Sequence, residues 1–136
     1  MAHETLRYRK LLGCDVKIFA DAAVKHSSAL ASRDLKDDVE DMISRGCADA
    51  VIVTGAATGR QASLEDLKAA KESAREIPVL AGSGVDLTNA AEVLAVADGL
   101  IVGTTLKRDA LTRNPVDRDR VRAFMQIVRI VRQTAS

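Results

Sequence analysis

Two stretches of sequence decide the fold: Pro78-Val79-Leu80-Ala81-Gly82-Ser83-Gly84 and, one helix length later, Ala97-Asp98-Gly99-Leu100-Ile101-Val102-Gly103-Thr104. Each stretch is a short, continuously apolar run that leads into small turn residues. Such runs are typical of strands covered on both faces, as in parallel sheets. We therefore expect strands at 78–81 and 99–102 that lie side by side and end in glycine turns at one edge of a sheet.

These two glycine turns predict a binding site for an anion. Where parallel strands end next to each other, the backbone N–H groups of their turns lie close together, and the dipole of a following helix adds positive potential. Many (β/α)8 barrels bind a phosphate group in this way after their last two strands. Turn geometry without a ligand explains the glycines as well. The predicted contacts of a small anionic or phosphorylated ligand are Gly82, Ser83, Gly84, Gly103, Thr104 and Thr105.

The rest of the chain alternates between strand and helix signals. After a first helix, the pattern predicts four strand–helix units in one domain that spans residues 1–136. This alternation favours a parallel sheet with right-handed crossovers. The expected strands are 16–21, 50–54, 78–81 and 99–102, and the expected helices are 3–12, 32–45, 63–75, one that begins at 86 or 88, and 117–132. The last helix is basic with an apolar stripe, and we expect it to pack on the sheet rather than on a membrane surface.

The composition excludes several classes of function. The chain of 136 residues carries 20 basic and 19 acidic side chains, so its net charge of +1 gives no reason to expect nucleic acid as a partner. With one tyrosine, two phenylalanines and no tryptophan, it offers no platform for stacking bases. No apolar run approaches the ~20 residues that cross a bilayer. The charged N-terminus does not resemble a signal peptide, and a cytoplasmic protein is expected.

Neither the cysteines nor the acidic residues have the spacing of metal ligands. Cys14 and Cys47 stand far apart in the sequence, and no His/Asp/Glu cluster has ligand spacing. No metal site and no cofactor are therefore predicted. The two cysteines are expected to be reduced thiols in or near the core.

One segment of the chain echoes another. The run Ala48-Asp49-Ala50-Val51-Ile52-Val53 recurs two strand–helix units later as Ala97-Asp98-Gly99-Leu100-Ile101-Val102. The echo suggests a repeated supersecondary unit. The alternative is that parallel strands generally look alike at their ends. Either interpretation predicts a series of equivalent strand–helix units.

A candidate catalytic group follows the first expected strand. Asp21, Lys25 and His26 lie where barrels and open α/β sheets place their chemistry, at the carboxyl ends of strands. Aspartate or histidine can act as a general base, and lysine as a base, a Schiff-base donor or a phosphate anchor. The alternative is that Lys25 and His26 are solvated loop residues.

Motifs along nearly the whole chain resemble one protein family, the BtpA/SgcQ family. The resemblance is carried, in order, by 7–9, 24–28, 48–55, Gly59, 82–84, Asn89, 97–104, 114–117, Arg120 and Val121. It implies a (β/α)8 barrel. It also implies a link to the biogenesis of photosystem I in cyanobacteria and to sugar metabolism in bacteria, but no defined reaction. Family members are about twice as long, and the resemblance covers their C-terminal half.

Half a barrel leaves one face of its sheet uncovered. A (β/α)8 barrel typically needs about 250 residues, so four strand–helix units cannot close one. The inward side chains, expected to include Ile18, Ile52, Leu80 and Ile101, then need a partner layer. Two copies could pair as a homodimer, or a complementary half-barrel chain could supply the missing half. A flavodoxin-like open parallel sheet, covered on both faces, is the third possibility.

Three functions of different classes fit these observations. The first is an enzyme, or a remnant of one, that binds a phosphorylated metabolite. The second is a non-catalytic assembly or biogenesis factor of the photosystem I type, and the third is a half-barrel with a purely structural role. An enzyme requires a closed pocket and a general base aimed into it, whereas the other two need only a surface.

Overall fold

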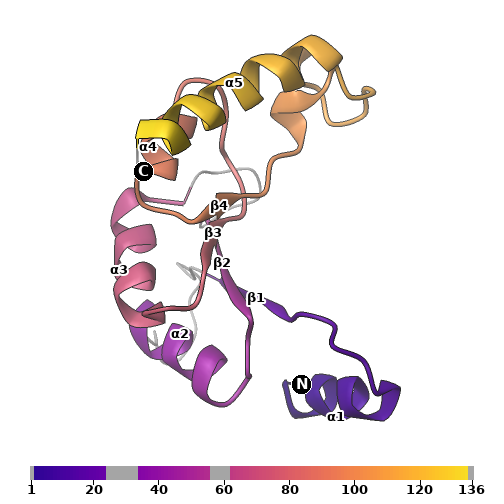
Figure 1. Ribbon diagram of the computed structural model, residues 1–136, viewed down its shortest axis with the longest axis vertical. Helices are drawn as coiled ribbons and strands as arrows, with labels where there is room; N and C mark the ends of the chain where they lie inside the picture. Colours follow the sequence, from indigo (N-terminus) through magenta and orange to yellow (C-terminus); the bar gives the residue numbers. More distant parts are fainter. Residues whose placement is uncertain (1, 24–33, 56–61, 135–136) are drawn as a thin grey trace.

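A computed structural model describes residues 2–23, 34–55 and 62–134 (Figure 1). Four parallel strands form one sheet in the order β1-β2-β3-β4, which confirms the predicted α/β fold. The strands are β1 (Phe19–Ala23), β2 (Ala50–Thr54), β3 (Val79–Ala81) and β4 (Gly99–Leu100). The helices are α1 (Ala2–Leu12), α2 (Leu35–Ser44), α3 (Leu64–Ala74), α4 (Ala90–Leu94) and α5 (Arg118–Thr134), with 3-10 turns η1 (Thr104–Leu106) and η2 (Arg108–Ala110).

The core lies between the sheet and helices on one of its sides. Figure 1 shows α2, α3 and α4 along the same side of the sheet. Val51 and Val53 of β2 are fully buried there, and they share a core with Val39 of α2 and Leu67 of α3. Burial of such side chains stabilises each by about 1.5–3 kcal/mol over an exposed position. This layer fixes the sheet and, with it, the turns at the strand ends.

The opposite face of the sheet is open in the described part of the chain. Phe19 is 55% exposed and Ile101 44% exposed, and Ile52 and Leu80 are half-buried. The register pairs Phe19 with Ala50 of β2, on the open face of the sheet. Ala22 of the same strand is buried on the face that the helices cover. The inward position of the first strand is therefore Phe19, and the expectation of Ile18 was wrong.

The first strand begins three residues later than expected because of Asp49. The carboxylate of Asp49 accepts a hydrogen bond from the Ile18 N–H (2.8 Å), and its own N–H donates to the Ile18 carbonyl (2.8 Å). The side chain thus takes the place of a ladder partner, and strand pairing starts at Phe19. The segment 16–18 (Val-Lys-Ile) before it lies outside the strand.

The sequence echo has a structural counterpart. Asp98 makes the same two hydrogen bonds to Val79 that Asp49 makes to Ile18. Its carboxylate accepts the Val79 N–H (2.7 Å), and its own N–H donates to the Val79 carbonyl (2.8 Å). Each aspartate also pairs with a cation, Asp49 with Arg9 (3.1 Å) and Asp98 with Lys71. Both therefore tie an odd-numbered strand to the even-numbered one after it.

Two expectations about the surface have different outcomes. Cys14 and Cys47 are both exposed free thiols, so the prediction that they lie in or near the core was wrong. On α5, Phe124 and Val128 are buried, and the helix contacts α4 and η1. The helix therefore packs through its apolar stripe, mainly against α4 and η1, where the sequence had predicted the sheet. No helix among the described residues has the length and apolar character to cross a membrane.

The two aspartates predict a loss of stability in acid. The Ile18 N–H bond holds the pKa of Asp49 below its ordinary value. At Asp98, partial burial opposes the shift, but the Lys71 and Val79 hydrogen bonds outweigh it, and that pKa is lowered too. The unfolded chain therefore takes up protons first. The stabilisation is complete above about pH 5 and is lost as the pH falls through the folded-state values.

Urea unfolding between pH 6 and pH 3 measures this loss. We expect the double variant Asp49→Asn/Asp98→Asn to have a flatter pH dependence than the unchanged chain. Glu76→Gln, at an exposed carboxylate in the turn after α3, is the control and should leave the slope as it is. Equal slopes in all three proteins would show that other carboxylates cause the acid sensitivity.

Candidate functional site

A pocket joins the two predicted glycine turns. It lies beyond the carboxyl ends of β3 and β4 and has a volume of about 490 Å³. Its lining comprises Gly82, Ser83, Gly84, Val85, Asp86, Ile101, Val102, Gly103, Thr104, Thr105 and Ala110. The structure thus brings together all six residues expected to contact a phosphate. Val85, Asp86, Ile101, Val102 and Ala110 are lining residues that the sequence analysis did not assign to the site.

The first wall of the pocket depends on two glycines for different reasons. A Cβ at Gly82 would lie 2.5 Å from Cγ2 of Ile52 and 2.6 Å from Cγ2 of Thr54, so the strand end has no room for a side chain. Gly84 has φ of +71°, a conformation that favours glycine. The Gly82 N–H donates to the Val53 carbonyl (2.8 Å). This donor belongs to the sheet, so an anion at this turn would have to be met by other groups.

Asn89 and Asp86 hold this wall in shape. The Asn89 side chain donates to the Gly84 carbonyl (2.9 Å) and accepts from the Asp86 N–H (2.9 Å). One carboxylate oxygen of Asp86 accepts in return from the Thr88 hydroxyl (2.6 Å) and from the N–H groups of Thr88 and Asn89. The Thr88 hydroxyl bond is the largest cause of a lowered pKa at Asp86. The pair forms a reciprocal cap, related to a capping box, at the turn that leads to α4.

The second wall, Gly103 to Thr105, is fastened to α5. Nε of Arg120 donates to the Thr105 carbonyl (2.7 Å), and the Asp117 N–H donates to the Leu106 carbonyl (2.8 Å). The carboxylate of Asp117 caps α5 by accepting the N–H of Arg120 (3.1 Å). These contacts explain why the 114–121 motif accompanies the pocket in the sequence: it positions the wall.

Among the residues that the structure describes, no lysine or arginine lines the pocket. Lys107 could have reached an anion there, but its ammonium group donates a hydrogen bond to the Thr112 carbonyl. The polar side chains that line the pocket are those of Ser83, Thr104 and Thr105, together with Asp86, whose carboxylate already accepts hydrogen bonds from Thr88 and Asn89. Backbone groups of the two turns complete the lining. This arrangement suits recognition by N–H and hydroxyl donors rather than by a charged side chain.

The candidate catalytic group is separate from this pocket within one chain. Asp21 is exposed in the middle of β1, and its carboxylate accepts the Thr54 hydroxyl (2.8 Å). It does not line the pocket, because β2 and β3 lie between β1 and β4. Lys25 and His26 lie outside the described residues. Among residues 2–23, 34–55 and 62–134, no group of three or more His, Cys, Asp or Glu side chains could hold a metal ion.

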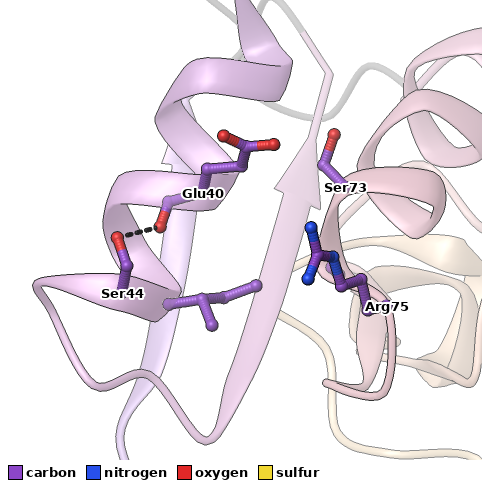
Figure 2. Close-up of a pocket in the computed structure, with 6 residues that line it drawn as sticks. Glu40, Ser44, Ser73 and Arg75 are labelled. Carbon is purple, nitrogen blue, oxygen red and sulfur yellow. Dashed lines mark hydrogen bonds between the residues drawn. The ribbon is translucent and has the colours of Figure 1, made fainter.

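A second, smaller pocket lies between the C-terminal ends of α2 and α3. Its volume is about 250 Å³. Figure 2 shows Glu40 and Ser44 of α2 across from Ser73 and Arg75 at the end of α3. Arg75 has φ of +55°, where glycine is the usual residue. The sequence has no glycine at the end of α3 to mark this turn, and the pocket was not among the predicted sites.

The sequence model of the BtpA family matches residues 1–130 of this chain. The chain belongs to the BtpA family. This confirms the resemblance found in the sequence, including the motifs that form both walls of the pocket.

Relatives in several organisms support the BtpA assignment. The photosystem I biogenesis protein BtpA of Synechocystis is 44% identical over 125 residues, which are 92% of this chain and 44% of that protein. An uncharacterised protein of Archaeoglobus fulgidus is 49% identical over 92% of this chain and 48% of its own length. The chain spans about half the length of the curated relatives it matches.

Two solved structures share the fold. N-(5'-phosphoribosyl)anthranilate isomerase from Pyrococcus furiosus matches with a TM-score of 0.60 and 18% identity, over 96% of this chain and 58% of that chain. The phosphoribosyl anthranilate isomerase of Thermococcus kodakaraensis matches with a TM-score of 0.59 and 20% identity, over 92% and 57%. At this identity the likeness concerns the fold alone. It is consistent with half of a (β/α)8 barrel or with an open α/β sheet.

Proposed function

We propose that this BtpA-family chain binds the phosphate group of a small phosphorylated metabolite in the pocket beyond β3 and β4. The observation that carries the proposal is that the turns of two adjacent parallel strands line one pocket. In α/β folds, ligands bind beyond the carboxyl ends of strands, and barrels hold phosphate after neighbouring strands. The substrate named for both isomerases carries a phosphoribosyl group, which supports the same ligand class.

The lining chemistry suggests how an anion would be held. The carboxylate of Asp86 repels a phosphate, so the anion belongs near Ser83 and the 103–105 wall. Hydroxyl and N–H donors there form hydrogen bonds to phosphate oxygens, which are stronger than bonds between neutral groups. Arg120 donates to the Thr105 carbonyl from behind this wall, and its charge adds positive potential without contact. Such a site selects a phosphate by shape and donor geometry.

Catalysis is a separate part of the proposal. Asp21, Lys25 and His26 are the residues we propose for acid–base chemistry, since Asp21 lies in β1, toward the end of the sheet that bears the pocket, and Lys25 and His26 follow that strand in the sequence. Asp21 and Thr54 form a hydrogen-bonded pair there. Removal of a general acid or base typically lowers a rate by about 10²–10⁴-fold.

The second candidate function is a non-catalytic role in assembly. The observation that favours it is the name of the Synechocystis relative, a photosystem I biogenesis protein, at 44% identity over 92% of this chain. An assembly factor needs a surface that binds protein, and it has no need of a phosphate pocket. A phosphate titration therefore separates the two candidates.

We expect Gly103→Val to weaken phosphate binding at least tenfold. A Cβ at Gly103 meets no atom within 4 Å, so the added isopropyl group extends into open space beside the donors without displacing the fold. Isothermal titration with inorganic phosphate, and then with ribose 5-phosphate, measures the change. The matched control is Ala123→Val, the addition of two methyl groups at an exposed position of α5.

Two results would contradict the phosphate site. One is unchanged affinity in a folded Gly103→Val protein, which would place the anion elsewhere. The other is the absence of any binding by the unchanged chain at millimolar phosphate, which would favour the assembly role.

A further inference from the structure

The sheet has two open edges and one uncovered apolar face. β1 and β4 are its edge strands, and on the open face the largest exposed side chains at these edges are Phe19 (55%) and Ile101 (44%). Unpaired strand edges beside exposed apolar groups are sites of association. The question is which strand would pair with each edge.

The registers answer that question, because the chain repeats itself structurally. Phe19 pairs with Ala50 and Ala20 with Val51 in the first strand pair. Leu80 pairs with Gly99 and Ala81 with Leu100 in the second pair. The aspartates that tie the pairs, Asp49 and Asp98, stand immediately before Ala50 and Gly99. The β1-β2 and β3-β4 pairs are therefore equivalent units, with Phe19 equivalent to Leu80 and Ile52 equivalent to Ile101.

The junction between these two units is the pairing of β2 with β3, in which Ile52 lies opposite Leu80. Repeating that junction after β4 requires a strand equivalent to β3, and β1 of a second copy is such a strand. In this register, Ile101 lies opposite the partner's Phe19. The two most exposed apolar side chains of the open face would then cover each other.

We propose that a second copy of this chain closes the sheet, with β4 of each copy paired in parallel with β1 of the other. Two copies contribute eight strands, the number in the isomerase barrels, of which this chain covers about half. A two-fold axis makes the two seams identical, and no strand edge is left open. α1 has no buried residue and contacts the start of β2 through Arg9 and Asp49. α1 therefore does not cover the sheet, and we assign to α5 the place of the helix that packs over each β4-β1 seam.

The same register brings a new residue to the pocket. Gly82 lies beside Thr54, as the short approach of its Cβ to that side chain shows. The equivalent pair across the seam is Gly103 with the partner's Asp21. The second copy would therefore bring the candidate base Asp21 to the Gly103 end of this wall, and the donors left for an anion are those of Ser83, Thr104 and Thr105. This part deepens the proposed function and rests on the pocket being a ligand site.

Disulfide trapping tests the seam without any ligand. In a background with Cys14→Ser and Cys47→Ser, the pair Phe19→Cys/Ile101→Cys is oxidised with diamide in phosphate-free buffer and run on a non-reducing gel. Within one chain the two positions are three strand spacings apart across the sheet, about 14 Å, and four residues out of step along it, which is beyond the reach of a disulfide. Only a link between copies can form. The matched control is Phe19→Cys/Leu111→Cys, since Leu111 is also 44% exposed but follows η2, outside the sheet.

We expect the Phe19→Cys/Ile101→Cys pair to run mainly as a dimer of twice the 14.5 kDa chain mass, and the control mainly as a monomer. A ladder of higher oligomers would overturn closure by two copies, and equal cross-linking of the control would overturn the register. The pair Asp21→Cys/Gly103→Cys tests the position of Asp21 in the same way. If it stays monomeric while the first pair links, the partner's carboxylate is not at the pocket.

A measurement on the unchanged chain covers the case in which the cysteine variants do not fold. Sedimentation velocity at 10–100 micromolar should give a dimer, and Phe19→Asp should convert it to a monomer. A compact monomer throughout that range would overturn the proposal and favour an open α/β sheet. The cross-linking and sedimentation results do not depend on phosphate binding, so the seam and the phosphate site can fail independently of each other.

Discussion

Leu67→Ala is expected to lower the free energy of unfolding by about 2–5 kcal/mol, the range measured for leucine-to-alanine changes in protein cores. Leu67 is fully buried and belongs to the core between α3 and the sheet. The variant loses the transfer free energy of the removed atoms, and a cavity remains where the close-packed neighbours cannot collapse. Urea unfolding followed by circular dichroism, at one fixed protein concentration, measures the change.

The matched control for this prediction is Leu87→Ala. Leu87 is 38% exposed, so its truncation removes less buried area and should cost well under half as much. A Leu67→Ala protein as stable as the Leu87→Ala protein would show that α3 is not held against the sheet as the structure describes.

The fold was predictable where the local signals agreed with one another. The expected strand 50–54 is β2 residue for residue, and Ser63 caps α3 by accepting the Asp66 N–H (3.0 Å), as its sequence position indicated. The first strand was misplaced because β1 is rich in alanine, a weak strand former, whereas Val16 and Ile18 before it are β-branched and resemble the start of a strand. A side chain 31 positions away in the sequence, that of Asp49, decides where the pairing starts, and no local pattern contains that information.

The pocket was predictable in its location more than in its chemistry. Glycines after two adjacent parallel strands must lie at one edge of a sheet, which sufficed to predict both walls. The roles of the donors depend on contacts distant in sequence. The Gly82 N–H is taken by Val53, and Thr105 is held by Arg120, 15 positions further on. Asp86 and Asn89 did carry a local signal, the spacing of a reciprocal cap, and it was used only to place a helix start.

The separation of the candidate catalytic residues from the pocket is informative about the protein. Asp21 lies toward the same end of the strands as the pocket, but on β1, which is three strands away from β4 and Gly103. In a sheet that closes into a barrel, the first and last strands become neighbours, and this distance disappears. An active site that uses both groups therefore requires closure. The seam between β4 and β1 is the feature on which any catalytic function of this half-length chain depends.

A single added methyl group should have opposite consequences at the two glycines of the pocket. We expect Gly82→Ala to destabilise the fold by about 1–3 kcal/mol, the usual cost of overpacking. The new Cβ would lie within 2.6 Å of the Cγ2 atoms of Ile52 and Thr54, and both are branched side chains with little freedom to move. Gly103→Ala meets nothing within 4 Å. It should leave stability unchanged or raise it by up to about 1 kcal/mol, since alanine restricts the unfolded chain.

Urea midpoints of the two alanine variants, measured side by side, test this difference, and phosphate titration of the folded proteins gives it meaning for the site. The contact at Gly82 is made with β2, so this glycine serves the packing of the strand ends and forms the pocket floor indirectly. Gly103 faces open space, so its lack of a side chain serves the pocket itself. If both variants lose the same stability, the two glycines have one structural role, and Gly103 is not kept small for a ligand.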